Sequence, residues 1–455
     1  MSTYKPSIPK GTRDFLPEQY SKRKYIFNTI ERVFKRYGFK PIETPAMELL
    51  STLTGKYGDE GDKLIFKILN SGDFLQSVPT TTYEKRDNIS FIPHICEKAL
   101  RYDLTVPFAR FVVQHYNELS FPFKRYQIQP VWRADRPQKG RYREFYQCDI
   151  DVIGSNSLLN EAELIKITDD IFTHLGIDVI IKINNRKILA GIAEVCGIGD
   201  KLIALTTALD KLDKQGWDMI EQELLSKEIP EDAVIKIREL LVLKDSITDM
   251  LDAVSEFVKT SETGRTGIAE TKEILKYAKL LGIKNHIEFD MSLARGLNYY
   301  TGAILEVKAR TLEMGSISGG GRYDDLTGIF GLNNMSGVGI SYGADRIYDV
   351  MESLNLFPET VSSFTHVLIC HLDQYTLCYC LPLLQALHQH NIAAEIYPDT
   401  VKMKKQLSYA DKNCIKYVVI AGSEEMSKNV FTLKDMSTSE QWLLSLDGVI
   451  EKVRS

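Results

Sequence analysis

A block of helical sequence interrupts an otherwise strand-rich chain. Between residues 195 and 280 the apolar side chains recur at helical spacing, and no convincing strand pattern is present. The spacing is carried by Ile220 and Leu224, by Ile237, Leu240 and Leu241, and by Leu251, Val254 and Phe257. Strand-like runs stand on both sides of the block, at 64–69, 123–132, 144–153, 178–184 and 301–308. We therefore expect a helical domain inserted into a sheet that the chain completes only after the insertion.

The connections between the strand-like runs predict the type of sheet. Alternating patterns with short connections outnumber clean strand–helix–strand spacings, which favours an antiparallel sheet. At 455 residues the chain also exceeds what one hydrophobic core usually supports, so several domains are expected. After Met351 the stretch "ESLNLFPETVSSF" loses periodicity and is typical of a linker. Beyond it "HVLICHL", "AAEIY" and "YVVIAG" alternate with helical patterns, which predicts an α/β unit with parallel strands.

These patterns predict an α+β chain of three domains. The first combines residues 1–194 and 281–352, the second is the helical insertion 195–280, and a linker at 353–363 leads to the third at 364–455. In the first domain "SKRKYIFNTIERVFKRYG" has helical apolar spacing and ends at Gly38. The run "FKPIETPAMELL" follows, and its two prolines confine it to an edge or an irregular strand.

Charge and hydropathy exclude several classes of protein. Fifty-six basic residues against 61 acidic ones argue against a surface coated with cations, so any site for a polyanion must be local. The start "MSTYKPSIPKG" has no apolar core, and no later run approaches the roughly 18 apolar residues of a membrane span. We expect neither secretion nor membrane insertion, and a cytoplasmic location.

The cysteines predict packing rather than metal binding. There are seven, an odd number without a CxxC pair, which suits reduced thiols. The closest cluster, Cys370, His371, Cys378 and Cys380, matches no common zinc template. We assign no metal ligand to the protein side chains.

A basic segment stands out in this mildly acidic chain. Its pattern is a strand, a polar loop from Ala134 to Gly140 and a second strand, which together predict a hairpin over residues 123–151. The cations are Lys124, Arg125, Arg133, Arg136, Lys139, Arg141 and Arg143. Arginine forks match the geometry of phosphate oxygens. A solvated, purely structural hairpin is the alternative.

Two glycine-rich segments suggest close approach of backbone to a ligand. "GVGISYGADRIYDVM" is a strand leading into a helix near Ala344, and Arg346 in its first turn opposes the helix dipole unless an anion is near. "SISGGGRYDDL" contributes three consecutive glycines. A dinucleotide-binding loop is the rival interpretation, but GxGxxG and its βαβ frame are missing.

The run "LARGLNYYTGAILEV", residues 293–307, places polar groups in an apolar strand-like segment. Arg295, Tyr299 and Tyr300 stand there beside two glycines, which marks either a bend or a ligand site. Taken singly, each could be a core tyrosine with a satisfied hydroxyl or a structural ion-pair partner.

Five motifs in order carry a family resemblance. "RYDLTVPFAR", "VWRADRPQKGRYREFYQCDID", "LARGLNYYTG", "GGGRYDDL" and "GISYGADR" resemble histidyl-tRNA synthetases, which are class II aminoacyl-tRNA synthetases. The likeness spans nearly the whole chain from "KGTRDFLP", and the first motif resembles the eukaryote-like branch more than the other bacterial form. The resemblance implies a six-stranded antiparallel catalytic sheet, a helical insertion and a C-terminal anticodon-binding domain.

The resemblance implies a ligase that forms histidyl-adenylate from L-histidine and ATP and transfers the histidyl group to tRNA(His). Arg133 and Arg295 would hold the α-phosphate, Arg295 standing where other class II enzymes use a metal ion. Arg346 would face the γ-phosphate, and Arg141 and Arg143 would help to hold the nucleotide. Mg²⁺ would bridge the remaining phosphates.

The same resemblance implies a pocket for histidine. Tyr300 would hydrogen-bond the imidazole with Tyr299 beside it, Asp151 would bind the other ring nitrogen, and Tyr323 would line the pocket. The α-amino group would be held by Asp103, Thr105 and Gln147.

Partners follow from the resemblance as well. The tRNA would meet the hairpin loop, the helical insertion and the C-terminal unit, with Gln138 near the extra 5′ guanosine of histidine tRNA. The family is dimeric, with "FKPIETPAMELL" as its interface motif and Pro45 in the matching position. The alternative is a catalytically inactive paralogue that keeps the fold as a regulatory subunit.

Overall fold

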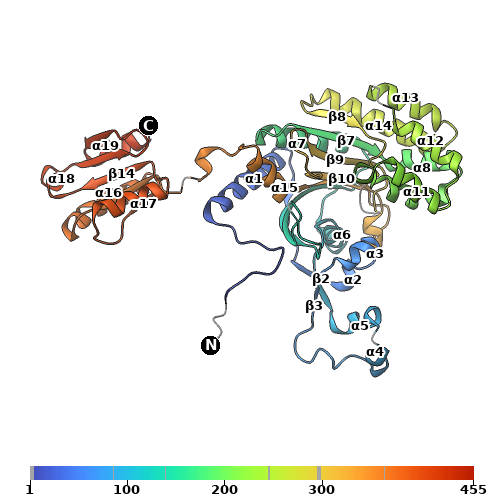
Figure 1. Ribbon diagram of the computed structural model, residues 1–455, viewed down its shortest axis with the longest axis horizontal. Coiled ribbons are helices and arrows are strands. Elements are labelled where there is room, and N and C mark those ends of the chain that lie inside the picture. Colours follow the sequence, from blue (N-terminus) through green and yellow to red (C-terminus); the bar gives the residue numbers. More distant parts are fainter. Residues whose placement is uncertain are drawn as a thin grey trace. The chain divides into compact units, whose positions relative to one another are not determined.

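The chain forms two compact units, Met1–Phe357 and Pro358–Ser455 (Figure 1). The computed structural model describes residues 5–85, 87–138, 140–243, 246–294, 299–362 and 364–454. The larger unit contains an eight-stranded sheet and the inserted helices. The smaller unit is an independent α/β fold.

An eight-stranded sheet is the scaffold of the larger unit, in the order β1-β5-β6-β11-β10-β9-β7-β8. Its strands are β1 (Lys40–Pro41), β5 (Phe123–Trp132), β6 (Glu144–Ile153), β7 (Val179–Asn185), β8 (His286–Phe289), β9 (Ala303–Ala309), β10 (Ser318–Tyr323) and β11 (Gly337–Gly343). The six strands from β5 to β7 pair antiparallel, which confirms the expected sheet. The expectation missed the two edges, because β1 and β8 each add to the sheet through a parallel pair.

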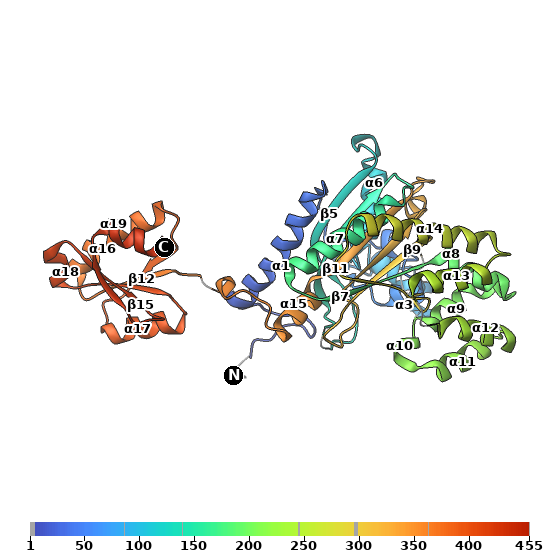
Figure 2. The same cartoon turned by 90° about the horizontal axis from the view of Figure 1, so that it is seen from above.

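One face of this sheet is covered by helices. The helices α1 (Pro17–Arg36), α7 (Leu159–Leu175), α14 (Glu262–Leu280) and α15 (Ala344–Ser353) supply apolar side chains to the main core (Figure 2). On β6 the side chains of Cys148, Ile150 and Val152 point into that core. Because successive residues of a strand face opposite sides, Gln147, Asp149 and Asp151 must line the other face. The alternation of β6 therefore builds a polar floor on the face away from the core.

The opposite face is bounded by α6 (Thr105–Gln114) and a small second sheet (Figure 1). That sheet has the order β2-β4-β3, with β2 (Met47–Leu49), β3 (Lys67–Ile68) and β4 (Lys98–Leu100). Short helices surround it: α2 (Leu50–Leu53), α3 (Gly58–Lys63), α4 (Thr80–Lys85) and α5 (Asn88–Ile95). Arg101 links the two sheets, since its guanidinium donates to the carbonyls of Thr44, Pro45 and Pro130.

The helical insertion has a core of its own. It is built by α8 (Arg186–Val195), α9 (Leu202–Leu209), α10 (Leu212–Gln215), α11 (Trp217–Ser226), α12 (Glu231–Leu241), α13 (Ile247–Phe257) and α14. Leu224, Ile237, Leu251 and Val254, four of the residues that gave the helical spacing, are buried in it. Helices α8 and α14 cross so closely that a Cβ on Gly191 would lie 2.4 Å from the Cα of Gly264. The absence of a Cβ at both glycines permits this close crossing.

The smaller unit contains a five-stranded sheet in the order β13-β12-β14-β15-β16. Its elements are β12 (Val367–His371), α16 (Gln374–Gln389), β13 (Ala394–Ile396), α17 (Met403–Lys412), β14 (Tyr417–Ala421), α18 (Ser423–Lys428), β15 (Phe431–Asp435), β16 (Gln441–Leu444) and α19 (Leu446–Arg454). The three predicted parallel strands are confirmed. The antiparallel strands β15 and β16 were not predicted, and they extend the sheet past β14.

Within the described ranges, no helix combines the length and apolar character that crossing a membrane requires.

Candidate active site

Three strands place a polar row of side chains side by side on the open face of the large sheet. The register aligns Asp149 with Gln127 of β5 and Ser341 of β11, and Asp151 with Arg125 and Gly339. These rows come from the predicted hairpin, which the pairing of β5 with β6 confirms, and from the predicted glycine-rich strand. Segments far apart in sequence thus share one surface.

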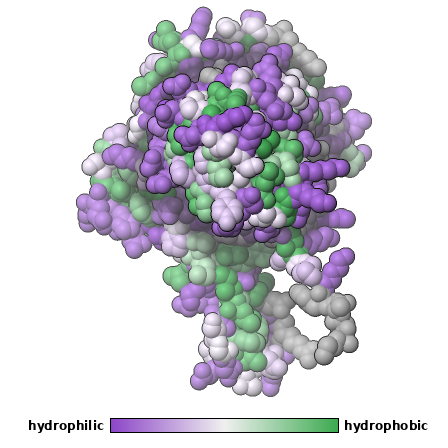
Figure 3. Space-filling view, turned by 90° about the vertical axis from the view of Figure 1, so that its left-hand side faces the viewer, coloured by the Kyte–Doolittle hydropathy of each residue, from purple (hydrophilic) through white to green (hydrophobic). Residues whose placement is uncertain are grey.

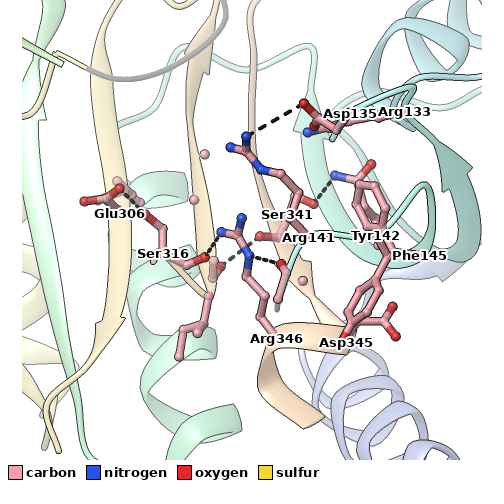
Figure 4. Close-up of a pocket in the computed structure, with 18 of the residues that line it drawn as sticks. Arg133, Asp135, Arg141, Tyr142, Phe145, Glu306, Ser316, Ser341, Asp345 and Arg346 are labelled. Atoms are coloured by element: carbon pink, nitrogen blue, oxygen red, sulfur yellow. Dashed lines mark hydrogen bonds and ion pairs between the residues drawn. The ribbon is translucent and has the colours of Figure 1, made fainter. Parts of the chain in front are cut away.

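A cavity of about 530 Å³ opens over this surface (Figure 4). Five of the expected site residues line it: Arg133, Arg141, Gln147, Tyr300 and Arg346. Backbone lines it too, because Gly319 and Gly320 of the glycine triplet form part of the wall. Three guanidiniums and a strip of backbone therefore meet in one hollow.

Local contacts position each of the three lining arginines. The Nε of Arg133 donates to the Tyr102 carbonyl at 3.1 Å, and its guanidinium lies 4.2 Å from the centre of the Tyr102 ring. Arg346 donates from Nε to the Gly140 carbonyl at 2.9 Å and from Nη1 to the Ser316 carbonyl at 2.5 Å. Arg141 is more exposed, and its Nη1 lies 3.7 Å from a carboxylate oxygen of Asp135. A cluster of cations is suited to bind a polyanion such as a triphosphate.

Two expected residues of the basic hairpin, Arg143 and Gln138, are not among the residues that line this hollow. Arg143 is not among the residues that line it, because its guanidinium donates to the carbonyls of Asp135 and Lys10. Its role in nucleotide binding stays a prediction. Gln138 is exposed at the tip of the hairpin loop, in a tight turn closed by backbone bonds with Arg141. Arg295 lies outside the described residues.

The acidic end of the site begins at Asp103, which is 2% exposed. Its Oδ1 accepts hydrogen bonds from the Tyr57 hydroxyl at 2.9 Å and the Val106 backbone N–H at 3.2 Å, while its Oδ2 is buried without a partner. Burial raises the pKa of Asp103 above its usual range. Gln147 also has a buried acceptor without a hydrogen-bond partner. Its Nε2 donates to the Ser341 hydroxyl at 2.7 Å, and its Oε1 accepts no hydrogen bond. Both groups can accept hydrogen bonds from a ligand.

Asp151 is held rigidly at the neighbouring position. Its Oδ1 accepts a hydrogen bond from the Tyr323 hydroxyl at 2.5 Å, and its Oδ2 lies 2.6 Å from the Nη2 of Arg125. Burial raises the pKa of the Asp151 carboxyl, and the Arg125 charge opposes that rise. A Cβ on Gly339 would lie 2.0 Å from the Asp151 Oδ1, so only glycine fits there.

Three tyrosines enclose the same corner. The ring centres of Tyr299 and Tyr300 are 5.0 Å apart, and those of Tyr299 and Tyr323 are 6.2 Å apart. A hydrogen bond with Thr105 holds the Tyr299 hydroxyl. Burial raises the pKa of all three phenols, so they remain neutral hydrogen-bonding groups at physiological pH. The structure thus places Tyr299, Tyr300 and Tyr323 beside Asp151, with Tyr300 in the cavity wall, and their role in binding histidine stays a prediction.

Sequence reasoning did not assign three residues that the structure places in this network. Arg125 was counted only as part of the basic hairpin, yet it is fully buried and pairs with Asp151. Asp149 lies between Gln147 and Asp151 on β6. The two-residue alternation of that strand could have revealed that Asp149 shares their face of the sheet. Asp345 also lines the cavity, where Arg13 and Arg23 bind it, and no local pattern connects residues so far apart.

An antiparallel six-stranded core sheet, with loop arginines at one end of a polar pocket, is the architecture of a class II aminoacyl-tRNA synthetase catalytic domain. The family model described as histidyl-tRNA synthetase matches residues 11–76 and 97–347, and the model described as anticodon binding domain matches 366–455. The chain belongs to the histidyl-tRNA synthetase family.

Individual relatives agree with this placement. The chain is 55% identical over 451 residues to the histidine–tRNA ligase of Phocaeicola vulgatus, covering 99% of both chains. It is 56% identical over 448 residues to the histidine–tRNA ligase of Christiangramia forsetii, covering 98% of both. Among solved structures, the histidyl-tRNA synthetase of Nostoc sp. PCC 7120 superposes with a TM-score of 0.83 at 31% identity, covering 99% of both chains.

Proposed function

We propose that this protein activates L-histidine with ATP and transfers the histidyl group to the 3′ end of tRNA(His). The observation that supports this most directly is the polarity of the site. Carboxyl groups and unpartnered acceptors lie at one end, where an amino acid's ammonium and imidazole can bind. Three guanidiniums line the cavity, together with carboxylates such as Asp135 and Asp345, and a triphosphate can bind these guanidiniums.

In the first step, the histidine carboxylate attacks the α-phosphorus of ATP. The bond from that phosphorus to the bridging oxygen breaks, and pyrophosphate leaves. Negative charge on the α-phosphoryl oxygens is stabilised by Arg133, together with Arg295, while Arg346 faces the γ-phosphate. Cations fixed in advance stabilise this charge without reorganising during the reaction.

Tyr299, Tyr300 and Tyr323, together with Asp151, would select histidine over other amino acids. Tyr300 and the Asp151 carboxylate would each hydrogen-bond one nitrogen of the substrate imidazole. The Tyr323 hydroxyl donates to Asp151 and holds it in place. A pocket built for these hydrogen bonds rejects a side chain that lacks them by about 10⁴- to 10⁵-fold. Such discrimination needs no separate editing site.

Magnesium fits this site through the nucleotide. In the part of the chain that is described, no group of three or more His, Cys, Asp or Glu side chains is arranged to hold a metal. Mg²⁺ commonly binds through phosphate oxygens and one or two carboxylates, and Glu306 supplies a carboxylate in the cavity wall. Bound there with ATP, Mg²⁺ would neutralise phosphate charge.

In the second step, the terminal adenosine of tRNA(His) takes the histidyl group from the adenylate. The hairpin loop with Gln138 would approach the acceptor end, and the smaller unit would bind the anticodon. The helical insertion would be a third contact with the tRNA.

Purified protein is expected to catalyse ATP–pyrophosphate exchange that depends on histidine, and to aminoacylate histidine tRNA. The result is measured with labelled pyrophosphate and with labelled histidine on tRNA transcripts. Transcripts with and without the extra 5′ guanosine test the loop at Gln138, since only a contact there makes the two differ.

A regulatory paralogue would bind histidine but show no exchange above background. The fold alone does not separate the two, because the ATP phosphoribosyltransferase regulatory subunit/histidyl-tRNA synthetase of Bacillus halodurans shares it at 19% identity and a TM-score of 0.70. Retention of Arg133 and Arg346 in the cavity wall and of the smaller unit favours the enzyme.

We further infer a homodimer that works in the cytoplasm, where tRNA is charged. The interface motif exposes Pro45, Met47 and Leu49, the last two at 53% and 50%. The arm between β3 and β4 also exposes large apolar side chains (Figure 3): Leu69, Phe74, Leu75, Tyr83 and Ile89. Exposed apolar patches of this kind mark protein interfaces.

Sedimentation velocity tests the dimer. We expect twice the 51.7 kDa chain mass for the natural protein, and the single-chain mass for the double variant Met47→Glu with Leu49→Glu, because charge opposes burial. Leu280→Glu is the matched control, since Leu280 is 76% exposed on α14, away from the interface motif. A monomeric natural protein at micromolar concentration would contradict the inference.

A further inference from the structure

The sheet floor beside the cavity carries three buried carboxyl groups on described residues. Asp103, Asp149 and Asp151 are each only 2–3% exposed. Arg125, fully buried, forms an ion pair with Asp151 and lies 4.3 Å from the Phe108 ring centre. Two further guanidiniums act on these carboxyl groups from nearby, Arg133 on Asp103 and Arg101 on Asp149, but both donate hydrogen bonds to backbone carbonyls. Buried charge is costly unless it is paired, so this floor favours a cationic ligand.

Buried acceptor atoms without hydrogen-bond partners indicate that the ligand carries N–H donors. On the floor, Asp103 Oδ2, Gln147 Oε1 and Asp149 Oδ1 are buried acceptors without a hydrogen-bond partner. Arg125 contributes the unpartnered donor Nε, and its Nη2 meets Asp151 as an ion pair without hydrogen-bond alignment. Buried polar atoms in native proteins nearly always have partners, so orphaned ones call for a bound group. A primary ammonium provides a positive charge and three N–H donors.

The position of Asp149 follows from the sheet. It lies two residues from both Gln147 and Asp151 on β6, so its side chain lies on the same face as theirs, between the two. Ser341 stands opposite it on β11 and links it to Gln147, because the Ser341 hydroxyl accepts from Gln147 and donates to Asp149. One Asp149 oxygen is thus held by Ser341, and the other is buried without a hydrogen-bond partner.

We propose that Asp149 is a further specificity residue of this pocket, binding the α-ammonium of histidine together with Asp103 and Gln147. This rests on the proposed function, because it takes histidine as the ligand. The role differs from that of Asp151, which binds the imidazole in the proposed function while Tyr323 and Arg125 hold its carboxylate in place.

Binding of histidine is expected to release a proton from Asp149. Burial, with a smaller contribution from Asp151 and Asp103, raises the pKa of Asp149 to about 7, although Arg125 and the Ser341 hydroxyl act to lower it. At neutral pH the free protein therefore holds this carboxyl partly protonated. An ammonium placed beside it favours the carboxylate, so the proton leaves as histidine binds. Histidine affinity should rise as the pH rises through about 7.

Calorimetric titration of Asp149→Asn with three ligands tests the proposal. Histidine and histidinol carry the amino group, whereas 3-(imidazol-4-yl)propanoate lacks it. We expect the variant to bind the first two at least about tenfold more weakly, the loss typical of a hydrogen bond to a charged group, and to bind the third about as the natural protein does. The third ligand is the internal control for the fold and for the imidazole corner.

Proton release gives a second, independent measurement. Titrating the natural protein with histidine near pH 7 in two buffers of different ionisation enthalpy should show protons released, and Asp149→Asn should reduce that number. The natural protein supplies this result even if the variant does not fold, and Asp149→Ser then replaces it in the ligand series.

Three outcomes would overturn the role of Asp149: equal weakening for all three ligands, unchanged histidine affinity in the variant, or no proton release by the natural protein. Failure of the proposed function looks different, since natural protein would then give no histidine-dependent exchange. A natural protein that binds histidine with proton release but gives no exchange would retain the role of Asp149 and reject the enzyme.

Discussion

Arg133→Ala is expected to lower histidine-dependent ATP–pyrophosphate exchange by about 100- to 1,000-fold, the usual cost of removing one preorganised donor from a developing oxyanion. The Tyr102 carbonyl and ring hold the Arg133 guanidinium in the cavity wall before substrate arrives. The loss should fall mainly on kcat rather than on the KM for ATP, because the charge that Arg133 meets grows in the transition state. Steady-state exchange at several ATP concentrations measures both quantities.

Arg136→Ala is the matched control for this result. Arg136 belongs to the same hairpin loop but is exposed and is not among the residues lining the cavity. We expect its exchange rate to stay within about twofold, because surface charges distant from a site contribute little. Exchange by Arg133→Ala at a near-normal rate, with the control also active, would reject the phosphate role of Arg133.

Arg322→Ala is expected to destabilise the larger unit by about 3–5 kcal/mol, the range for breaking a buried ion pair on one side. Arg322 is 4% exposed, and its Nε and Nη2 bind the two carboxylate oxygens of Glu161 at 2.5 and 2.7 Å. Its Nη1 also donates to the Ser336 hydroxyl at 2.6 Å. Removing the guanidinium leaves Glu161, which is fully buried, charged and alone. Denaturant unfolding followed by the fluorescence of the larger unit measures the change.

Two comparisons make the stability result specific. The double variant Arg322→Met with Glu161→Met should recover part of the loss, since no unpaired charge remains buried. Arg310→Ala removes an arginine whose partner Asp178 is 3.5 Å away and whose side chain is 54% exposed, so its effect should stay within about 0.5 kcal/mol. An Arg322 variant as stable as the Arg310 variant would contradict the assigned structural role.

The motif that contains the glycine triplet both lines the cavity and stabilises the fold. Gly319 and Gly320 form cavity wall, while Arg322 in the same motif ties β10 to α7 through Glu161. The sequence pattern predicted close approach of backbone to a ligand. It did not predict the ion pair, because Glu161 belongs to a helix far away in the chain.

Much of the fold was predictable because side-chain periodicity is a local property. Two-residue alternation predicted the hairpin of β5 and β6, and the 3.6-residue pattern predicted α1 and the helices of the insertion. The parallel edge strands β1 and β8 escaped prediction, since a short strand gains its place only from a neighbour distant in sequence. The antiparallel strand β15 escaped prediction although Phe431 and Leu433 alternate with polar residues in it, because it has only five residues, and β16 has four that are exposed or half-buried.

By itself, the sequence determined the family, the alternation of the strands and the arginine and tyrosine motifs, since each is written in residues close together along the chain. Only the tertiary structure decided which of these groups meet. It joined Arg125 to Asp151, bound Asp345 to Arg13 and Arg23, and left Asp149 with a buried oxygen unpartnered. The physical reason is that burial and charge pairing depend on distances between segments that only packing brings together.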